Sequence, residues 1–291
     1  MNRISFNALI LLMLGLLTGL PRLAHAAQSY DNCTGFITSL PTTISSQGTW
    51  CLKQDLSTAI TSGMAININT NNVTIDCNDF KIGGLAAGAG TQAEGIYAAA
   101  VQNVTVRNCN IRGFAYGIYL GHYGGFVVED NRLDSNTEYG VVVYGDGSVV
   151  RRNRVFDTGG SSVVTSASAY GIHAVYSVDV LDNTVSGVTA TVGNNGSADG
   201  ISVQINDGGS ISGNRVRAVL ADGTGQASGI SFSGGSSRNT IRGNDVIGSS
   251  APGINYGVQC DNANQHAKDN VINGYATGIL TCTDDGNVVA P

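Results

Sequence analysis

A short phrase, glycine followed by isoleucine or valine, recurs eight times along the chain, at intervals as short as about 22 residues. The residues around it alternate between apolar and polar, which is the period-two pattern of a strand with one buried face. Apolar positions three and four residues apart, which a helical repeat needs, are absent. The repeat therefore predicts a solenoid of short stacked strands. The copies begin at Gly95, Gly117, Gly140, Gly171, Gly200, Gly229, Gly257 and Gly278.

A second phrase lies between successive glycine phrases and reads apolar, x, apolar, x, x, Asn, x, apolar. Asparagine tolerates the left-handed backbone of a tight turn, and its amide can bond the neighbours above and below it. We expect these residues to form a structural ladder inside the turns of the solenoid. The ladder positions are Asn78, Asn131, Asn153, Asn183, Asn214, Asn244 and Asn270, with Cys109 in place of asparagine in one copy.

The motif Val73-Thr74-Ile75-Asp76-Cys77-Asn78, the later Asn108-Cys109-x-Ile111 and the glycine phrases together resemble the right-handed parallel β-helix superfamily. That superfamily includes the pectate lyase-like folds and the periplasmic repeat proteins typified by the nitrous-oxide-reductase copper accessory protein. The resemblance covers roughly residues 73–282. It implies an all-β chain, a right-handed parallel β-helix of about eight coils with an N-terminal cap. The superfamily holds lyases, hydrolases, esterases, epimerases, adhesins and accessory proteins, so the fold leaves the function open.

The first residues of the chain are typical of an export signal. Arg3 supplies a positive start, Ala8–Leu20 an apolar run, and Ala24-His25-Ala26 the small residues before a cleavage site. We expect cleavage after Ala26, then a capping region over 27–62 and the β-helix over 63–291. The apolar run is too short to span a bilayer, so the protein is predicted to be secreted or periplasmic, with no membrane span. The net charge of −6 argues against nucleic acid or anionic lipid as the main partner.

All six cysteines follow the predicted leader, and an even count in an exported chain favours disulfides. Metal ligation is the weaker interpretation, because the sequence has no C-x-x-C pair. The repeat register favours three pairs, which would staple the two ends of the solenoid. These pairs are Cys33–Cys51, Cys77–Cys109 and Cys260–Cys282.

The strand register predicts which side chains face outward from the glycine strands. One outward row precedes each glycine and another follows each Ile or Val, and together they are rich in tyrosine. Tyrosine suits sugar rings, because it offers an apolar face and a polar tip. The alternative is that stacked tyrosines only cover the turns of the solenoid. The predicted polysaccharide-binding set is Tyr97, Tyr116, Tyr119, Tyr139, Ser202 and Ser231.

Three coils are longer than the others, and their extra residues fall over Thr158–Ala169, Val188–Ala198 and Leu220–Ala227. Insertions in solenoids collect on the functional face. The candidate catalytic residues beside them are His173 as general acid or base, with Asp199 and Tyr170. The alternative is that the insertions are decorations and His173 is solvated.

No cofactor or metal site is predicted. Calcium would require a carboxylate cluster, and Glu129-Asp130 and Asp284-Asp285 are the only adjacent acids. The three-aspartate set of polygalacturonase-like sites is fragmentary, and the Asp-Pro-His motif of mannuronate epimerase-like sites is missing. A copper-handling role lacks clusters of Met or His.

Two functional hypotheses follow. In the favoured one, the chain is an exported β-helix protein that binds polysaccharide or another cell-surface partner through its tyrosine rows, without clear catalytic machinery. In the second, it is a polysaccharide lyase or other carbohydrate-active enzyme that acts on an acidic polysaccharide near His173. Whether the chain is an enzyme, and its oligomeric state, are left open.

Overall fold

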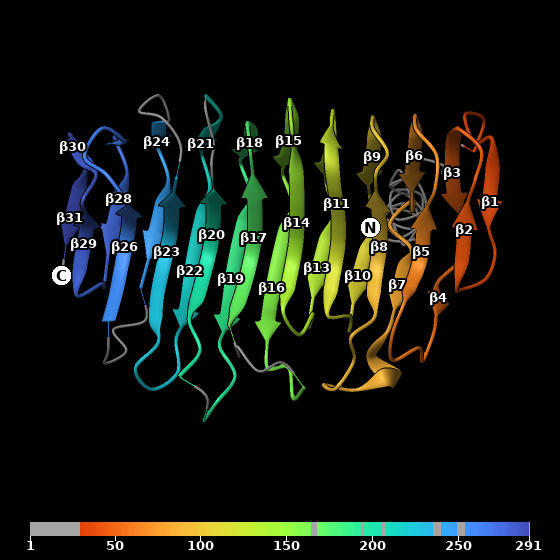
Figure 1. Cartoon of the computed structure of the whole chain (residues 1–291), viewed down its shortest axis with the longest axis horizontal. Coiled ribbons are helices and arrows are strands. Elements are labelled where there is room, and N and C mark those ends of the chain that lie inside the picture. Colours follow the sequence, from red (N-terminus) through yellow and green to blue (C-terminus); the bar gives the residue numbers. More distant parts are fainter. Residues whose placement is uncertain are drawn as a thin grey trace, which may run out of the picture. The chain divides into compact units, whose positions relative to one another are not determined.

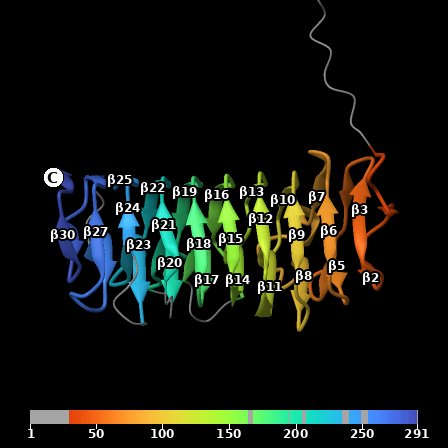
Figure 2. The same cartoon turned by 90° about the horizontal axis from the view of Figure 1, so that it is seen from above.

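The computed structural model describes residues 30–163, 168–193, 195–204, 208–234, 240–248 and 254–290. The predicted leader, 1–26, lies outside the described residues. Three parallel sheets, here named A, B and C, make up the unit Cys33–Pro291. The chain visits the sheets in a repeating order, so each strand pairs with the equivalent strand of the next coil, as Figures 1 and 2 show.

Each sheet consists of short strands that lie side by side in chain order. Sheet A contains β1 (Gly35–Ile37), β3 (Gly48–Leu52), β6 (Val73–Asp76), β9 (Val104–Arg107), β12 (Val127–Glu129), β15 (Ser148–Arg151), β18 (Val178–Leu181), β21 (Ser210–Ser212), β24 (Thr240–Arg242), β27 (His266–Lys268) and β30 (Thr283–Asp285). Sheet B contains β2 (Thr42–Ile44), β5 (Met64–Ile68), β8 (Glu94–Ala99), β11 (Tyr116–Gly124), β14 (Tyr139–Asp146), β17 (Ala169–Val175), β20 (Ala198–Gln204), β23 (Gln226–Ser233), β26 (Ile254–Cys260) and β29 (Thr277–Leu280). Sheet C contains β4 (Leu56–Ser57), β7 (Lys81–Gly83), β10 (Asn110–Arg112), β13 (Arg132–Asp134), β16 (Arg154–Gly159), β19 (Thr184–Thr189), β22 (Arg215–Leu220), β25 (Asp245–Ile247), β28 (Val271–Asn273) and β31 (Val288–Ala290).

The described strands make more coils than the expected eight. The eight glycine phrases correspond to β8 through β29 of sheet B, whereas β2 and β5 precede them without the phrase. The number of glycine phrases is therefore smaller than the number of coils, because the coils at the N-terminal end lack the phrase. Strands β1–β4 fall within the stretch predicted to be a cap and pair with the following coils. The boundary of the cap at residue 62 stays a prediction.

A row of glycines allows the coils to stack closely in sheet B. A Cβ added to Gly117 would lie 2.6 Å from the carbonyl oxygen of Gly140, and one added to Gly140 would lie 2.5 Å from that of Gly171. The same approach recurs from Gly171 to Gly200 and from Gly200 to Gly229. Such distances leave no room for a side chain, so the recurring glycine is a steric requirement of the stack. The following Ile or Val points into the core, as predicted, and Ile118, for example, is fully buried.

The predicted asparagine ladder is confirmed between sheets A and C from Asn131 onward. The predicted first member, Asn78, is instead partly exposed and donates to Leu52 O at 3.1 Å, and Cys77 beside it is the buried residue that is bonded to Cys109. Each amide of the ladder donates to the carbonyl of the preceding coil and to the side-chain oxygen of the next asparagine. Asn183, for example, donates to Val150 O at 2.9 Å and to Asn214 Oδ1 at 3.0 Å. The left-handed backbone belongs to the residue before the asparagine in most coils, such as Arg152 at φ 54° before Asn153. The ladder runs from Asn131 through Asn153, Asn183, Asn214, Asn244 and Asn270 to Asn287.

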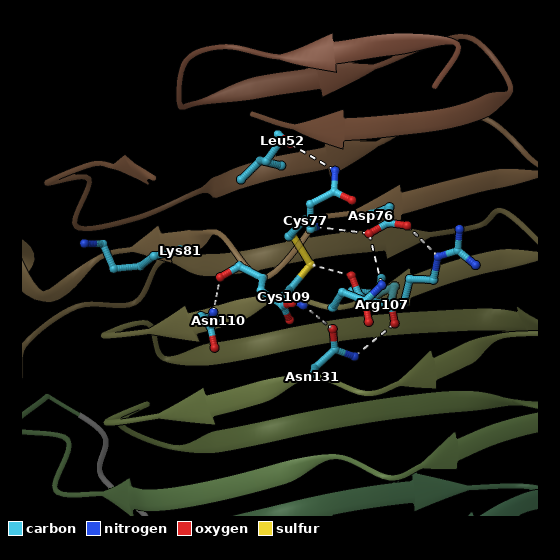
Figure 3. The surroundings of a disulfide bond; sticks show 12 residues. Leu52, Asp76, Cys77, Lys81, Arg107, Cys109, Asn110 and Asn131 are labelled. Carbon is cyan, nitrogen blue, oxygen red and sulfur yellow. Dashed lines mark hydrogen bonds and ion pairs between the residues drawn. A yellow bond between two sulfur atoms is a disulfide. The ribbon is translucent and has the colours of Figure 1, made fainter. Parts of the chain in front are cut away.

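All three predicted disulfides are confirmed, and no described cysteine is free. Figure 3 shows Cys77–Cys109 at the start of the ladder, where the backbone N–H of Cys109 donates to Asn131 Oδ1 at 3.0 Å. Beside it, Arg107 is paired with Asp76 at 2.8 Å. The bridge therefore joins two consecutive coils at the position where cysteine replaces asparagine.

Candidate functional site

The outer face of sheet B carries two in-register rows of side chains on either side of the buried glycine-isoleucine pair. The first row precedes each glycine and runs Glu94, Tyr116, Tyr139, Tyr170, Asp199, Ser228, Tyr256 and Thr277. The second row follows each Ile or Val and runs Tyr97, Tyr119, Val142, His173, Ser202, Ser231, Gln259 and Leu280. The predicted site residues therefore lie on one continuous surface, which we call the tyrosine face.

The tyrosines form two stacks along this face. Tyr116, Tyr139 and Tyr170 stack with ring centroids 4.7 and 4.8 Å apart and nearly parallel planes. Tyr97 and Tyr119 make a second stack at 5.2 Å. In-register tyrosines on parallel strands fall about one strand spacing apart, so the strand pairing itself brings the rings together. Because the flat ring surfaces within each stack cover one another, the stacks offer ring edges and hydroxyl groups to a ligand.

The two stacks meet where Tyr116 and Tyr119 pack edge to face, with ring centroids 6.0 Å apart. A tyrosine outside the predicted set, Tyr144, links the second stack to His173. The second row contains Val142 at the coil between Tyr119 and His173, and a valine is too short to continue the stack. Tyr144 lies two residues further along the same strand, and its ring centroid is 5.7 Å from those of both Tyr119 and His173. Val142 itself is only 1% exposed. The signal for Tyr144 was present in the sequence, as the next outward position of the same alternating strand.

His173 is enclosed by aromatic rings rather than solvated. Its side chain is 6% exposed, and its ring centroid lies 5.5, 5.7 and 5.9 Å from those of Tyr170, Tyr144 and Tyr139. Burial lowers the pKa of His173 to about 4, so the imidazole is neutral at physiological pH. Its Nδ1 has no hydrogen-bond partner among the described residues. No described ion pair or hydrogen bond links His173 to Asp199, the predicted helper.

A carboxyl group lies at each end of the stack formed by Tyr116, Tyr139 and Tyr170. Glu94 adjoins Tyr116, and Asp199 adjoins Tyr170 in the first row. Burial raises the pKa of each to about 7, and for Asp199 hydrogen bonds from Ser231 and Ser228 partly oppose that shift. Burial also raises the pKa of Glu138, the residue before Tyr139. The face therefore holds carboxyl groups that are partly protonated near neutral pH.

The tyrosine hydroxyls remain protonated. Burial raises the pKa of Tyr116 to about 12, with the nearby carboxyl groups of Glu138 and Glu94 adding to the shift. The pKa values of Tyr139 and Tyr170 shift in the same direction, first because of burial. Neutral phenols can both donate and accept hydrogen bonds. The stacks therefore present a line of neutral, two-way hydrogen-bonding groups.

Beyond Asp199 the face continues as a polar hydrogen-bonded network. Ser228 is fully buried and donates to Gln259 Oε1 at 3.1 Å, while Gln226 Nε2 donates to Ser228 Oγ at 3.1 Å. Ser202 is also buried, and Ser231 is partly exposed. Of the predicted serines, Ser231 is therefore the better placed to meet a ligand.

The long connections before β17, β20 and β23 lie side by side, as the insertion pattern predicted. A connection that the sequence interpretation did not count, residues 84–93 before β8, joins them and contains a short 3₁₀ helix, Leu85–Ala87. Together these segments border the tyrosine face along the junction with sheet C. The linking hydrogen bonds are Ser162 N to Ala89 O at 3.1 Å, Thr191 Oγ1 to Ser161 O at 3.0 Å, and Gln226 N to Ser197 Oγ at 3.2 Å. Residues 164–167 and 194 lie outside the described residues.

Comparison with known families places the fold. Residues 57–193 match a family model described as a right-handed β-helix region. The fold of the described residues is a right-handed parallel β-helix. Its three sheets continue with the same strand order beyond the matched region, through β31 at the C-terminal end.

Several solved structures are similar to this β-helix. The A-module of mannuronan C-5 epimerase AlgE6 from Azotobacter vinelandii is 14% identical, with a TM-score of 0.47 over 84% of this chain and 83% of that chain. The Dettilon tailspike protein is 15% identical, with a TM-score of 0.49 over 88% of this chain and 60% of that chain. An alginate lyase from Paenibacillus sp. str. FPU-7 is 10% identical, with a TM-score of 0.34 over 84% and 91%. A search of curated protein sequences finds no match.

Two further observations concern metals and location. Within the described ranges, no group of three or more His, Cys, Asp or Glu side chains is placed to hold a metal ion. The described residues also contain no helix long and apolar enough to cross a membrane. The three disulfides of the β-helix indicate an oxidising environment, extracellular or periplasmic.

Proposed function

We propose that the β-helix binds a polysaccharide along its tyrosine face. The observation that carries the proposal is the continuous line of partly exposed tyrosine edges and hydroxyls formed by Tyr97, Tyr119 and Tyr144 beside Tyr116, Tyr139 and Tyr170. A chain of repeated sugar units meets a repeated set of groups most easily when the groups sit on a regular scaffold. Strands about 4.8 Å apart, each offering one or two of these tyrosine hydroxyls from β8 to β17, provide such a scaffold.

The structure also refines how such a ligand would be held. Sugars often rest on the flat face of an aromatic ring, but here the stacked rings cover each other's faces. The main attraction would therefore come from hydrogen bonds between sugar hydroxyls and the tyrosine hydroxyls, helped by the ring edges. The rigid packing of the rings lowers the ordering cost of binding, because few rotamers remain to be frozen.

The test is a binding panel of soluble polysaccharides, measured by affinity electrophoresis and calorimetry with the purified protein. Tyr139→Phe keeps the stack but removes the hydroxyl, so it separates hydrogen bonding from packing. We expect Tyr139→Phe and Tyr119→Ala each to weaken binding by roughly fivefold or more, the scale of one lost hydrogen bond. Phe156→Ala, which truncates an outward aromatic on sheet C, is the matched control and should bind as the wild type. Equal loss in the control, or no binding by any protein, would refute the proposal.

His173 supports a second candidate, a polysaccharide lyase. Its imidazole is neutral, buried and adjacent to three tyrosines, and a neutral imidazole is the form that can accept a proton. Lyase activity would appear as ultraviolet absorbance from unsaturated products when a polyuronate is incubated with the protein. Absorbance that is lost in His173→Ala but kept in Phe156→Ala would establish this candidate, and its absence would remove it.

A further inference from the structure

Basic residues are segregated from the tyrosine face. None of the ten strands of sheet B contains lysine or arginine, and neither do the described residues of the connections on its two sides. Arg238, in one of those connections, lies outside the described residues. The arginines and lysines within the described ranges lie instead on sheets A and C or in the turns between them, where the described ion pairs also lie.

Acidic residues, in contrast, are present on the tyrosine face. Glu94 and Asp199 are four strand steps apart in the first row, which is roughly 19 Å at the usual strand spacing. They enclose the stack of Tyr116, Tyr139 and Tyr170. No described cation neutralises either carboxyl, so any charge they carry acts directly on a ligand that covers the stack.

We infer, building on the proposed function, that the tyrosine face selects an uncharged polysaccharide and discriminates against polyuronates. A glycan long enough to cover the stack extends over Glu94 or Asp199 at its ends. An ionised uronate placed there meets a like charge with no arginine nearby to compensate it. Sugar hydroxyls meet no such penalty, because carboxyl, phenol and serine groups all accept or donate hydrogen bonds to them.

The buried imidazole at the centre of the face agrees with this selection. His173 is neutral, so it adds no positive charge that an acidic glycan would need. Its unpartnered Nδ1 is a neutral hydrogen-bonding group enclosed by Tyr139, Tyr144 and Tyr170. The centre of the face thus offers neutral groups, and its two ends offer acids.

The experiment compares three classes of probe: uncharged glucans, mannans and xylans; the polyuronates pectate and alginate; and the amino polysaccharide chitosan. We expect at least one uncharged glycan to bind at least tenfold more tightly than either polyuronate. The affinity for that glycan should change less than twofold between 0.05 and 0.5 M NaCl, roughly the range over which surface charges become screened. Tighter binding of a polyuronate or of chitosan would overturn the inference and leave the proposed function standing. Failure of every glycan to bind would instead refute the proposed function.

Charge variants test the cause of the selection. Glu94→Gln combined with Asp199→Asn removes both acids, and we expect the preference for the uncharged glycan to shrink at least threefold. Glu94→Lys should shrink it further, by roughly tenfold, because it places a cation at the end of the stack. Asp245→Asn removes an acid from sheet C and is the matched control. A preference that is the same in all four proteins would overturn the inference, and circular dichroism of each variant checks that the fold is retained.

Discussion

Removal of one ladder asparagine should destabilise the β-helix far more than removal of an exposed one. The Asn183 side chain is 1% exposed and makes four hydrogen bonds. It donates to Val150 O and Asn214 Oδ1 at 2.9 and 3.0 Å, and it accepts from the backbone and side-chain N–H groups of Asn153 at 2.9 and 3.0 Å. Asn183→Ala removes the acceptor oxygen of two buried N–H groups of Asn153, one on the backbone and one on the side-chain amide.

Each buried group left without a partner costs about 1–3 kcal/mol, so the expected loss in the free energy of unfolding is about 2–6 kcal/mol. Asn183→Asp keeps the volume and the accepting oxygen but loses the donor and buries a charge, so we expect a loss at least as large. The control is Asn273→Ala, at an exposed position of β28, which should change stability by less than about 0.5 kcal/mol.

The assay is equilibrium unfolding in urea with the disulfides intact, followed by circular dichroism. Comparison of midpoints at constant slope isolates the change in stability. If Asn183→Ala unfolded at the same urea concentration as Asn273→Ala, the ladder would contribute no stability and the reasoning from buried hydrogen bonds would fail.

The remaining predictions concern packing, covalent bonds and pH. Gly171→Ala should lower the urea midpoint, because its Cβ would lie 2.5 Å from the carbonyl oxygen of Gly200. The control is Gly90→Ala, which should be tolerated because its Cβ would lie 3.4 Å from the nearest atom. Equal midpoints for the two variants would contradict the steric argument. Replacing Cys77 and Cys109 together by serine should cost about 2–4 kcal/mol, as expected for a bridge closing a loop of this length, and unchanged thermal unfolding would contradict that estimate. Burial lowers the pKa of His173 to about 4, so between about pH 4 and the usual pKa near 6.5 the native state binds fewer protons than the unfolded state. The stability contributed by this group is therefore present above pH 6.5 and is lost as the pH falls. His173→Gln should show a smaller loss of stability than wild type between pH 6.5 and 4. Because the pKa of Asp199 is raised to about 7, its ionisation destabilises the native state as the pH rises, and Asp199→Asn should gain stability relative to wild type at pH 8 more than at pH 5.

Much of the architecture was predictable because the stacking of coils imposes a repeat on the sequence itself. The glycine phrase, the alternation around it and the asparagine spacing each reflect a contact between one coil and the next, so register and disulfide pairing follow from spacing. The count of coils was not predictable from the phrase, because β2 and β5 pair with their neighbours through backbone hydrogen bonds that any residue can make. The same spacing is enough to place Tyr116, Tyr139 and Tyr170 in one row.

Side-chain conformation and burial were decided only by the tertiary structure. The sequence predicts that Tyr139 and Tyr170 are neighbours, but it does not show that their rings stack face to face and leave only edges for a ligand. Nor does it show that the ring of Tyr144 contacts those of Tyr119 and His173, or that His173 is enclosed and neutral. A repeat specifies which backbone positions coincide, because main-chain pairing follows from spacing. The environment of a single side chain depends on rotamers and on neighbours from several coils at once, which only the assembled fold brings together.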